Sequence, residues 1–500
     1  MREKYESLAL TDLKAIAKAR GIKGTSAMKK AQLVEAMLLQ DEKDKEKETK
    51  EEAAVPDPEV SRGKEAAQTT KEETRPAEEK SGEKNTERES GKEVRAERTE
   101  KTEKTEKTER AERTENAGLD KFPAELDSGI TANGILEVMP DGFGFIRCEN
   151  YLPGENDVYV APSQIRRFNL KTGDIIEGNT RIKTQSEKFS ALLYLKKING
   201  LQPDIASKRC NFEDMTPIFP NERLHLERAG SSVAMRIMDL ISPVGKGQRG
   251  MIVSPPKAGK TTLLKEVAKS IKSIPNMHLI ILLIDERPEE VTDIKEAIEG
   301  PNVEVIYSTF DELPEHHKRV SEMVIERAKR LVEHKRDVTI LLDSITRLTR
   351  AYNLTVPPSG RTLSGGLDPA ALHMPKRFFG AARNMRGGGS LTILATALVE
   401  TGSKMDDVVY EEFKGTGNME MVLDRKLSEK RVFPAIDIPK SSTRREDLLL
   451  TKEELEAINI IRKALNGMKA EEAVDKVLDM FARTRNNNEF VQMVKKMRFI

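Results

Sequence analysis

The sequence MIVSPPKAGKTTLLKEVAKS at residues 251–270 decides the fold of this chain. It starts with an apolar run, Met251–Ser254, typical of a buried strand, and ends with a helical pattern from Thr262 to Ser270. Between the two lies SPPKAGKT at 254–261, which has the pattern of a phosphate-binding loop except that Ser254 replaces the first glycine. A strand, a short loop and a helix in this order are the context that such a loop requires.

A loop at a helix N-terminus directs backbone N–H groups and the positive end of the helix dipole at phosphate oxygens. Gly259 permits close approach of the backbone, Lys260 reaches the β- and γ-phosphates of a nucleotide, and the Thr261 hydroxyl can bind Mg²⁺. The nucleotide-binding residues predicted in the loop are Lys257, Ala258, Gly259, Lys260, Thr261 and Thr262.

Apolar runs alternate with helical patterns from about residue 221 to 500, which predicts a mostly parallel sheet with helices on both faces. The predicted helices include 262–270 and 317–333. The predicted strands are 251–254, 279–284, 303–307, 338–342 and 391–397.

Carboxylates end two of these strands, at the edge where open α/β sheets bind ligands. Glu286, in the run Asp285-Glu286-Arg287, could polarise a water for attack on a γ-phosphate, and Arg287 could pair with phosphate. Asp343 follows the apolar run 338–342 as a Walker B aspartate does, and would hold Mg²⁺. An ordinary solvated turn is the weaker interpretation once the phosphate loop is present.

A second glycine motif precedes the strand 251–254. It reads Gly245-Lys246-Gly247-Gln248-Arg249-Gly250. A dinucleotide-binding motif of this form follows a strand and opens a helix, so we reject that interpretation. The segment is interpreted as a basic turn that borders the nucleotide.

Residues 121–200 are predicted to form a five-stranded OB-type barrel, because short alternating runs are separated by turn signals such as Pro140-Asp141-Gly142. Phe143, Phe145 and Arg147 alternate and would share one face, which Tyr159 could extend. Paired aromatic rings beside a cation are typical of a surface that stacks nucleic-acid bases. The alternative is that both phenylalanines belong to the barrel core.

The remaining segments are less informative. Residues 1–40 are predicted to form a small helical module, for which a protein contact and a nucleic-acid contact fit equally. Residues 41–120, with KTEKTEKTER at 101–110, have almost no large apolar residue and are predicted to be a disordered charged linker or insertion. Residues 201–220 are interpreted as a linker. Two basic, small-residue loops, 357–366 and 401–404, fit either a polymer-gripping role or plain surface.

Composition excludes several classes. The chain has 84 Lys+Arg against 83 Asp+Glu, so net charge says nothing about a nucleic-acid partner. Two cysteines among 500 residues cannot form a disulfide framework, which favours the cytoplasm. The 6 histidines show no metal-ligand spacing. The longest apolar run, 279–284, is far below the ~20 residues of a membrane span, and the N-terminus lacks a signal peptide.

Long motifs give the chain a specific resemblance. It is similar to the bacterial Rho family of transcription termination factors from about residue 121 to the C-terminus, with a helical module matching at 1–40. The motifs are DGFGFIR at 141–147, PSQIRRFNLKTGD at 162–174, PPKAGKT at 255–261, LLIDERPEEVTD at 282–293, LLDSITRLTRAYN at 341–353, PKRFFGAARN at 375–384 and EEFKGTGNMEM at 411–421.

The resemblance implies a homohexameric ring of OB-type barrels and RecA-like P-loop domains that binds ATP and Mg²⁺ between subunits. Such a ring hydrolyses ATP to move 5′ to 3′ along single-stranded nascent RNA, preferring cytidine-rich RNA, and acts as an RNA/DNA helicase that releases transcripts from the RNA polymerase complex. A NusG-type elongation factor is a further implied partner.

The resemblance also implies residue roles. Lys260, Thr261, Glu286 and Asp343 would be catalytic, with Thr261 and Asp343 at the metal. Arg444 would act across the subunit interface, and Phe433 would stack on adenine. The implied RNA-binding residues are Gly142, Phe143, Gly144, Phe145, Ile146, Arg147, Asp157, Val158, Tyr159, Glu187, Lys188 and Phe189 in the barrel, and Arg361, Thr362 and Lys404 in the two channel loops.

Two other functions remain in competition. A rotary-type or recombinase-type ATPase shares the phosphate loop, but the aromatic barrel argues against it. A passive RNA-binding protein with a degenerate nucleotide site is disfavoured by the intact set of Lys260, Thr261, Glu286 and Asp343.

Overall fold

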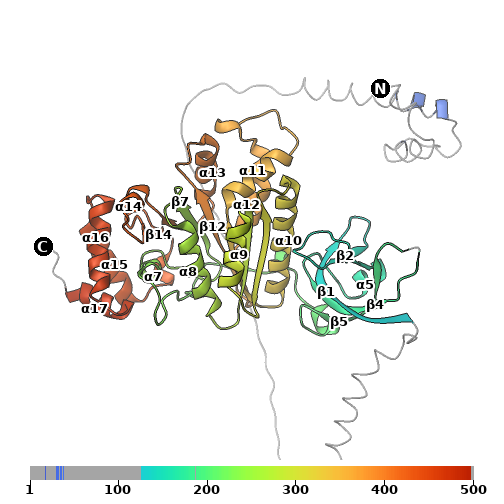
Figure 1. Ribbon diagram of the computed structural model, residues 1–500, viewed down its shortest axis with the longest axis horizontal. Helices are drawn as coiled ribbons and strands as arrows, with labels where there is room; N and C mark the ends of the chain where they lie inside the picture. Colours follow the sequence, from blue (N-terminus) through green and yellow to red (C-terminus); the bar gives the residue numbers. More distant parts are fainter. Residues whose placement is uncertain are drawn as a thin grey trace, which may run out of the picture. The chain divides into compact units, whose positions relative to one another are not determined.

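The computed structural model describes residues 126–185 and 187–496 (Figure 1). It also describes a few helical positions near the N-terminus, namely Ala17, 30–32, 34–36 and Leu38. The predicted helical module at 1–40 therefore lies mostly outside the described residues, and the predicted charged linker at 41–120 lies wholly outside them.

The first domain is a closed five-stranded barrel with strand order β1-β2-β3-β5-β4, as the turn signals predicted. Its strands are β1 (Asp127–Val138), β2 (Gly144–Arg147), β3 (Val158–Val160), β4 (Ile175–Arg181) and β5 (Ser190–Ile198). Helix α5 (Pro162–Arg167) places Ile165 in the barrel core. The segment that follows contains α6 (Pro203–Ala206), a 3₁₀ turn (Phe212–Asp214) and the short strand β6 (Pro217–Ile218).

The second domain is built on a nine-stranded sheet whose main path is β14-β13-β7-β12-β10-β8-β9. The strands from β13 to β9 are parallel, whereas β14, β11 and β6 pair antiparallel. Their bounds are β7 (Arg249–Ser254), β8 (Met277–Glu286), β9 (Val303–Thr309), β10 (Asp337–Asp343), β11 (Arg383–Met385), β12 (Ser390–Leu398), β13 (Met419–Val422) and β14 (Ser442–Thr443). All five predicted strands are present.

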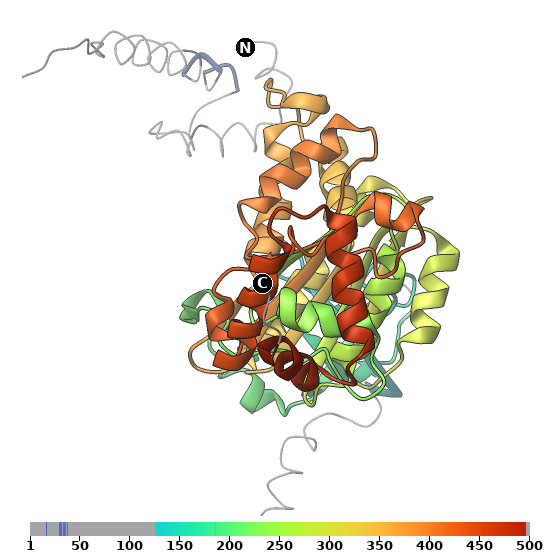
Figure 2. The ribbon, with the colours of Figure 1, turned by 90° about the vertical axis from the view of Figure 1, so that its left-hand side faces the viewer.

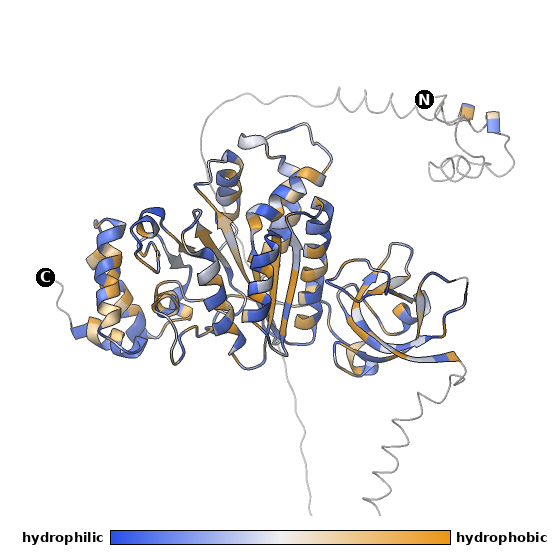
Figure 3. Cartoon of the chain, viewed as in Figure 1, coloured by the Kyte–Doolittle hydropathy of each residue, from blue (hydrophilic) through white to orange (hydrophobic). Residues whose placement is uncertain are grey.

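Helices cover both faces of this sheet because its strands are apolar on both sides. Along β8, Leu279, Ile281 and Leu283 enter one core, and Ile280, Leu282 and Ile284 enter the other. Figure 3 shows these strands in orange between helices with hydrophilic outer faces. The first core packs under α7 (Val233–Ile241), α8 (Lys260–Lys272), α9 (Pro288–Ala297), α15 (Lys452–Leu465), α16 (Ala470–Ala482) and α17 (Asn487–Lys496). The second packs under α10 (Pro314–Glu333), α11 (Ile345–Thr355), α12 (His373–Gly380) and α13 (Lys404–Lys414).

Strand β13 and the three C-terminal helices were not predicted from the sequence. Strand β13 has the sequence MEMV and lacks the run of β-branched residues that marks the other strands. Its place is set by pairing with β7, where Met419 lies opposite Gly250. The C-terminal helices cover the first core, and Figure 2 shows them in red in front of the strands.

The barrel contacts the edge of the sheet through polar side chains. The Asn150 side-chain amide donates to the Tyr307 carbonyl at 2.7 Å, and the Arg327 guanidinium donates to the Asn199 side chain at 2.7 Å. Asn199 also lies 3.2 Å from His334 Nε2. The two domains therefore meet across a partly buried interface in which these polar contacts lie beside apolar ones, since Ile135 and Tyr151 of the barrel belong to the second core.

We expect His334 to make stability depend on pH. Burial, helped by the nearby Arg209, lowers the pKa of His334 to about 4 from 6.5. The unfolded chain then binds a proton below pH 6.5 that the folded chain does not take up until about pH 4, so stability falls as the pH drops across this window. In thermal unfolding, the melting temperature of His334→Gln should fall less steeply from pH 6.5 to pH 4 than that of the wild type. Parallel curves would contradict the prediction.

Candidate functional site

The phosphate loop connects β7 to α8, as predicted. Gly259 is the residue before the helix and has a φ of 87°, which a glycine adopts without strain. Ser254, at the position of the missing glycine, is fully buried, and its hydroxyl donates to the Pro255 carbonyl at 2.9 Å. The substitution is therefore accommodated inside the loop and leaves the helix N-terminus open to an anion.

Lys260 lies between the two carboxylates that sequence analysis selected. Its Nζ is 3.1 Å from Glu286 Oε1 and 2.6 Å from Asp343 Oδ1. Both carboxylates are almost completely buried, at 3% and 2% exposure. Burial alone would lower the pKa of Lys260, but the charges of Asp343 and Glu286 outweigh it and raise that pKa. The structure thus gathers a cation, a candidate general base and a candidate metal ligand at one point.

Arg347 and Glu290 were not predicted as site residues from the sequence. Arg347 Nη1 donates to Glu286 Oε2 at 2.7 Å, and despite burial the Glu286 charge raises the pKa of Arg347. The Thr261 hydroxyl lies 3.5 Å from Glu290 Oε2. Arg347 stands in the first turn of α11 directly after Asp343, which is the signal that could have identified it. Arg287, by contrast, has a largely exposed side chain, 3.6 Å from Glu290.

A pocket of about 530 Å³ opens beside the phosphate loop. It is lined by Lys257, Gly259 and Thr262 of the loop and by Phe433, whose ring is half exposed. A Cβ added at Gly259 would lie 3.7 Å from the Phe433 ring. The position of Phe433 fits its predicted contact with a nucleotide base.

The segment 245–250 does not come to the phosphate loop of the same chain. It lies at the amino end of β7, and the loop follows the carboxyl end, about 17 Å away along the six-residue strand. Gly247 packs against the backbone of Arg383 and Asn384, which a side chain would displace. The prediction that this segment borders the nucleotide is therefore not met within one chain.

Arg444 lies at the same end of the sheet. Its N–H donates to the carbonyl of Asn418, the residue before β13, at 2.8 Å. Burial, with the charges of Arg383 and Arg444, lowers the pKa of Arg249, so these arginines form one cationic cluster. Since β7 and β13 are parallel, Arg444 and the phosphate loop stand at opposite ends of the sheet.

The aromatic residues form a cluster outside the barrel core. Phe145 lies 5.8 Å from Phe143, 6.0 Å from Tyr159 and 5.2 Å from Phe189, measured between ring centroids. Ile146, Val158 and Val160, which alternate with these residues, fill the core instead. Phe143 precedes β2 and belongs to the turn. The arrangement favours the stacking surface over the core interpretation.

Charged residues near this cluster contact one another or its rings. Arg147 is only 6% exposed, lies 4.9 Å from the centre of the Phe145 ring and forms ion pairs with Glu137 and Asp157. Glu187 pairs with Arg181, and Lys188 lies 5.2 Å from the Phe189 ring. Arg147 therefore supports the aromatic surface from below instead of projecting from it.

The two predicted channel loops contact each other. Gly365 packs against the backbone of Lys404 and Met405, with no room for a Cβ. Arg361, Thr362 and Lys404 are exposed. The structure thus brings together two basic loops that are far apart in sequence.

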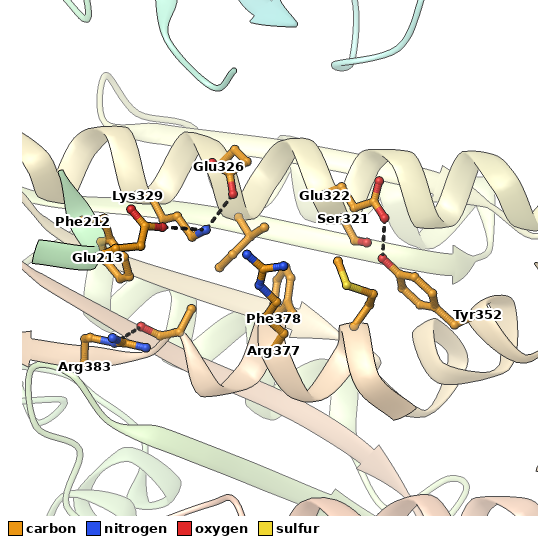
Figure 4. Close-up of a pocket in the computed structure, with 13 residues that line it drawn as sticks. Phe212, Glu213, Ser321, Glu322, Glu326, Lys329, Tyr352, Arg377, Phe378 and Arg383 are labelled. Atoms are coloured by element: carbon orange, nitrogen blue, oxygen red, sulfur yellow. Dashed lines mark hydrogen bonds and ion pairs between the residues drawn. The ribbon is translucent and has the colours of Figure 1, made fainter. Parts of the chain in front are cut away.

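Figure 4 shows another pocket, of about 310 Å³, between α10 and α12. Lys329 pairs with Glu326 at 2.7 Å on one side, and Tyr352 donates to Glu322 at 3.0 Å on the other. None of the predicted site residues lines this pocket.

In the described part of the chain, no three His, Cys, Asp or Glu side chains are grouped as metal ligands. None of the helices described there has the length and apolar character needed to cross a bilayer.

Comparison with known proteins assigns the two domains. Residues 132–204 match the family model of the Rho termination factor RNA-binding domain, residues 234–443 that of the ATP synthase alpha/beta nucleotide-binding domain, and residues 4–43 that of the Rho N-terminal domain. Transcription termination factor Rho of Pseudomonas aeruginosa is 56% identical over 373 residues, which cover 73% of this chain and 88% of that protein. The chain belongs to the Rho family of transcription termination factors.

Another Rho protein has a similar sequence identity to this chain. Transcription termination factor Rho of Escherichia coli is 54% identical over 379 residues, covering 75% of this chain and 90% of that one. Among solved structures, an ATPase of the type III secretion system of pathogenic bacteria has a TM-score of 0.48 and 19% identity, covering 63% of this chain and 94% of that chain. The family matches at 132–204 and 234–443 show that the chain joins a Rho RNA-binding barrel to an ATPase-type nucleotide-binding domain.

Replacement of Phe145 with alanine should weaken binding of single-stranded RNA by about 1–3 kcal/mol, the typical contribution of one base stacked on an aromatic ring. Phe168→Ala is a matched control, because Phe168 is also a half-buried barrel phenylalanine but lies outside the cluster. Fluorescence anisotropy with a labelled RNA measures both affinities. Equal losses in the two variants would contradict the stacking assignment.

Proposed function

We propose that this protein is an RNA-dependent ATPase that moves 5′ to 3′ along nascent RNA as a homohexameric ring. It unwinds RNA/DNA hybrids and releases the transcript from RNA polymerase. The observation that carries the proposal is the contact of Lys260 with both Glu286 and Asp343 in a Rho-family chain whose barrel has a partly exposed aromatic cluster. The barrel (121–200) would capture RNA, and the nucleotide-binding domain (221–500) would drive movement.

Glu286 is the proposed general base. It is buried and held by Lys260 and Arg347, so its carboxylate is oriented toward the phosphate loop. An attacking water would lose its proton to this carboxylate while Lys260 neutralises charge on the β- and γ-phosphates. Phe433 would stack on the adenine of ATP in the pocket beside Gly259, and Arg287 would contact the nucleotide.

Thr261 and Asp343 are the residues that would hold Mg²⁺ with ATP. A hydroxyl and a carboxylate are oxygen ligands of the kind Mg²⁺ prefers, and both lie at the phosphate loop. Asp343 keeps its orientation through the Thr396 hydroxyl, which donates at 2.7 Å. The ion would neutralise charge that develops on the phosphates.

Arg444 is proposed to complete the site of a neighbouring subunit. Its position at the opposite end of the sheet from its own phosphate loop supports this role, and Arg249 of the 245–250 segment lies in the same cationic cluster. The exposed loops with Arg361, Thr362 and Lys404 would line the ring channel and grip RNA. In the barrel, 142–147, 157–159 and 187–189 would hold the incoming strand.

The wider assignments follow from the family. We propose the cytoplasm as the location and a NusG-type elongation factor as a partner. Residues 1–40 would be a helical accessory module, 41–120 a charged linker or insertion, and 201–220 a linker between the barrel and the nucleotide-binding domain.

Replacing Glu286 with glutamine should lower RNA-stimulated ATP turnover by about 10²–10⁴-fold, because a positioned general base contributes that much. Binding of ATP should persist, since Lys260 and the pocket remain. Glu289→Gln, three residues along and exposed, is the matched control and should keep normal turnover. Normal turnover in Glu286→Gln would exclude this residue as the base.

Mixing two inactive variants tests the role of Arg444. Lys260→Ala and Arg444→Ala should each abolish turnover alone. In mixed rings, an intact phosphate loop from one variant can meet an intact Arg444 from the other, so ATP hydrolysis should return. Arg445→Ala, which removes an exposed arginine paired with Asp447, should stay active by itself. A mixture as inactive as its components would contradict action across the interface.

A further inference from the structure

The barrel rests on helix α10 by close backbone contact as well as by polar side chains. Gly173, in the turn before β4, packs so tightly against α10 that an added Cβ would lie 2.4 Å from the Glu326 carbonyl carbon. Arg209, which follows the barrel, joins Asp174 at 2.7 Å to Glu333 of α10 at 2.8 Å. If the barrel moves, α10 therefore has to move with it, because otherwise these contacts break.

One carboxylate of this interface also belongs to the RNA-binding surface. Glu137 Oε2 accepts from Arg147 at 2.6–2.7 Å, and Glu137 also accepts from Arg319 of α10 at 2.7–2.8 Å. Arg147 in turn lies against the Phe145 ring, 4.9 Å from its centre. Glu137 thus connects the aromatic surface to α10 through two ion pairs.

The charges of this cluster balance only when Arg319 takes part. Arg147 faces two carboxylates, Glu137 and Asp157, and all three side chains are mostly buried, at 6%, 16% and 2% exposure. Arg319 supplies the second positive charge. Without it, an unpaired negative charge would remain beneath a surface that has to accept phosphates, and a buried unpaired charge is costly. If RNA binding moves Arg147, the ion pair between Glu137 and Arg319 therefore changes as well.

Close to Arg319, helix α10 also connects to β8, the strand that carries Glu286. His317, two residues before Arg319, lies 2.7 Å from the Ser308 hydroxyl of β9. Ser308 pairs with Ile284 of β8, and the Phe310 N–H donates to the Glu286 carbonyl at 3.1 Å. A contiguous set of contacts thus extends from Phe145 to the residue proposed as the general base.

We infer that Glu137 and Arg319 are positioning residues that link RNA occupancy of the barrel to the nucleotide site through α10. Neither touches nucleotide. Glu137 orients Arg147 under the aromatic surface, and Arg319 transmits that orientation to α10. The inference deepens the proposed function and rests on it, since it presupposes that RNA and ATP bind to the same chain and influence each other.

The test is a linkage measurement on the full-length protein. The affinity for a cytidine-rich single-stranded RNA is measured with and without a non-hydrolysable ATP analogue, and the ratio is the coupling factor. Coupling between sites typically amounts to about 5–150-fold. In Arg319→Gln this factor should fall toward one, while basal ATP turnover and nucleotide affinity without RNA stay near wild type.

Two further variants separate coupling from folding. Arg319→Lys should restore the coupling, because a single nitrogen, Nη2, makes both contacts with the Glu137 carboxylate and an ammonium can replace it. Lys318→Gln removes the neighbouring, similarly buried cation, which faces Tyr352 instead of Glu137, and should leave the coupling unchanged. Thermal unfolding of each variant reports any general loss of stability.

The outcomes distinguish failure of the proposed function from failure of the link through Glu137 and Arg319. If the wild type shows neither coupling nor RNA-stimulated turnover, the proposed function fails. If the wild type couples and Arg319→Gln couples equally, the function stands and the link through Glu137 and Arg319 is wrong. Loss of coupling that Arg319→Lys does not restore would also overturn it, since the charge would then not be what matters.

Discussion

Two carboxylates, those of Glu286 and Asp343, are buried beside the ammonium of Lys260 at the carboxyl edge of the parallel sheet. Buried charges are tolerated only when they are paired and their remaining oxygens are hydrogen-bonded. Lys260 contacts both, Arg347 donates to the second oxygen of Glu286, and Thr396 donates to the same oxygen of Asp343 that contacts Lys260. The position of the phosphate loop is therefore tied to the two strands that carry the carboxylates, and any ligand phosphate has to enter this arrangement.

The hydrophobic core of the sheet brings Glu286 and Asp343 to the same place. In the parallel register of β10 and β8, Asp343 lies opposite Leu283, and Glu286 stands three residues further along β8. The alternation of apolar residues into two cores holds that register, because a shift of one residue would exchange the faces. The same rule works in the barrel: Ile146, Val158 and Val160 point inward, so Phe145 and Tyr159 are left on the outside, where bases can reach them.

Much of this could be predicted from local sequence. Apolar runs located five strands of the sheet, short alternating runs with turn signals predicted the five-stranded barrel, and the loop SPPKAGKT identified the anion-binding end of α8. Glu286 and Asp343 were found because parallel strands end at one edge. Arg347 was missed although it follows Asp343 closely in the sequence, because its contact with Glu286 depends on the direction of the first turn of α11, which residue spacing alone does not give. The burial of Arg147 and the location of 245–250 were likewise hidden, since each depends on contacts with residues far away in sequence: Glu137 and Asp157 pair with Arg147, and Arg383 and Asn384 pack on Gly247.

The location of the arginines also constrains assembly. The phosphate loop follows the carboxyl end of β7, whereas Arg249 and Arg444 stand at the amino ends of β7 and β13. The proposed role of Arg444 then requires one edge of a subunit to meet the opposite edge of the next, which is a head-to-tail contact. Contacts of this kind generate a ring if the rotation closes and a filament if it does not. In such a ring, each nucleotide site contains residues of two subunits. A change in the contacts with one nucleotide therefore also acts on the neighbouring subunit.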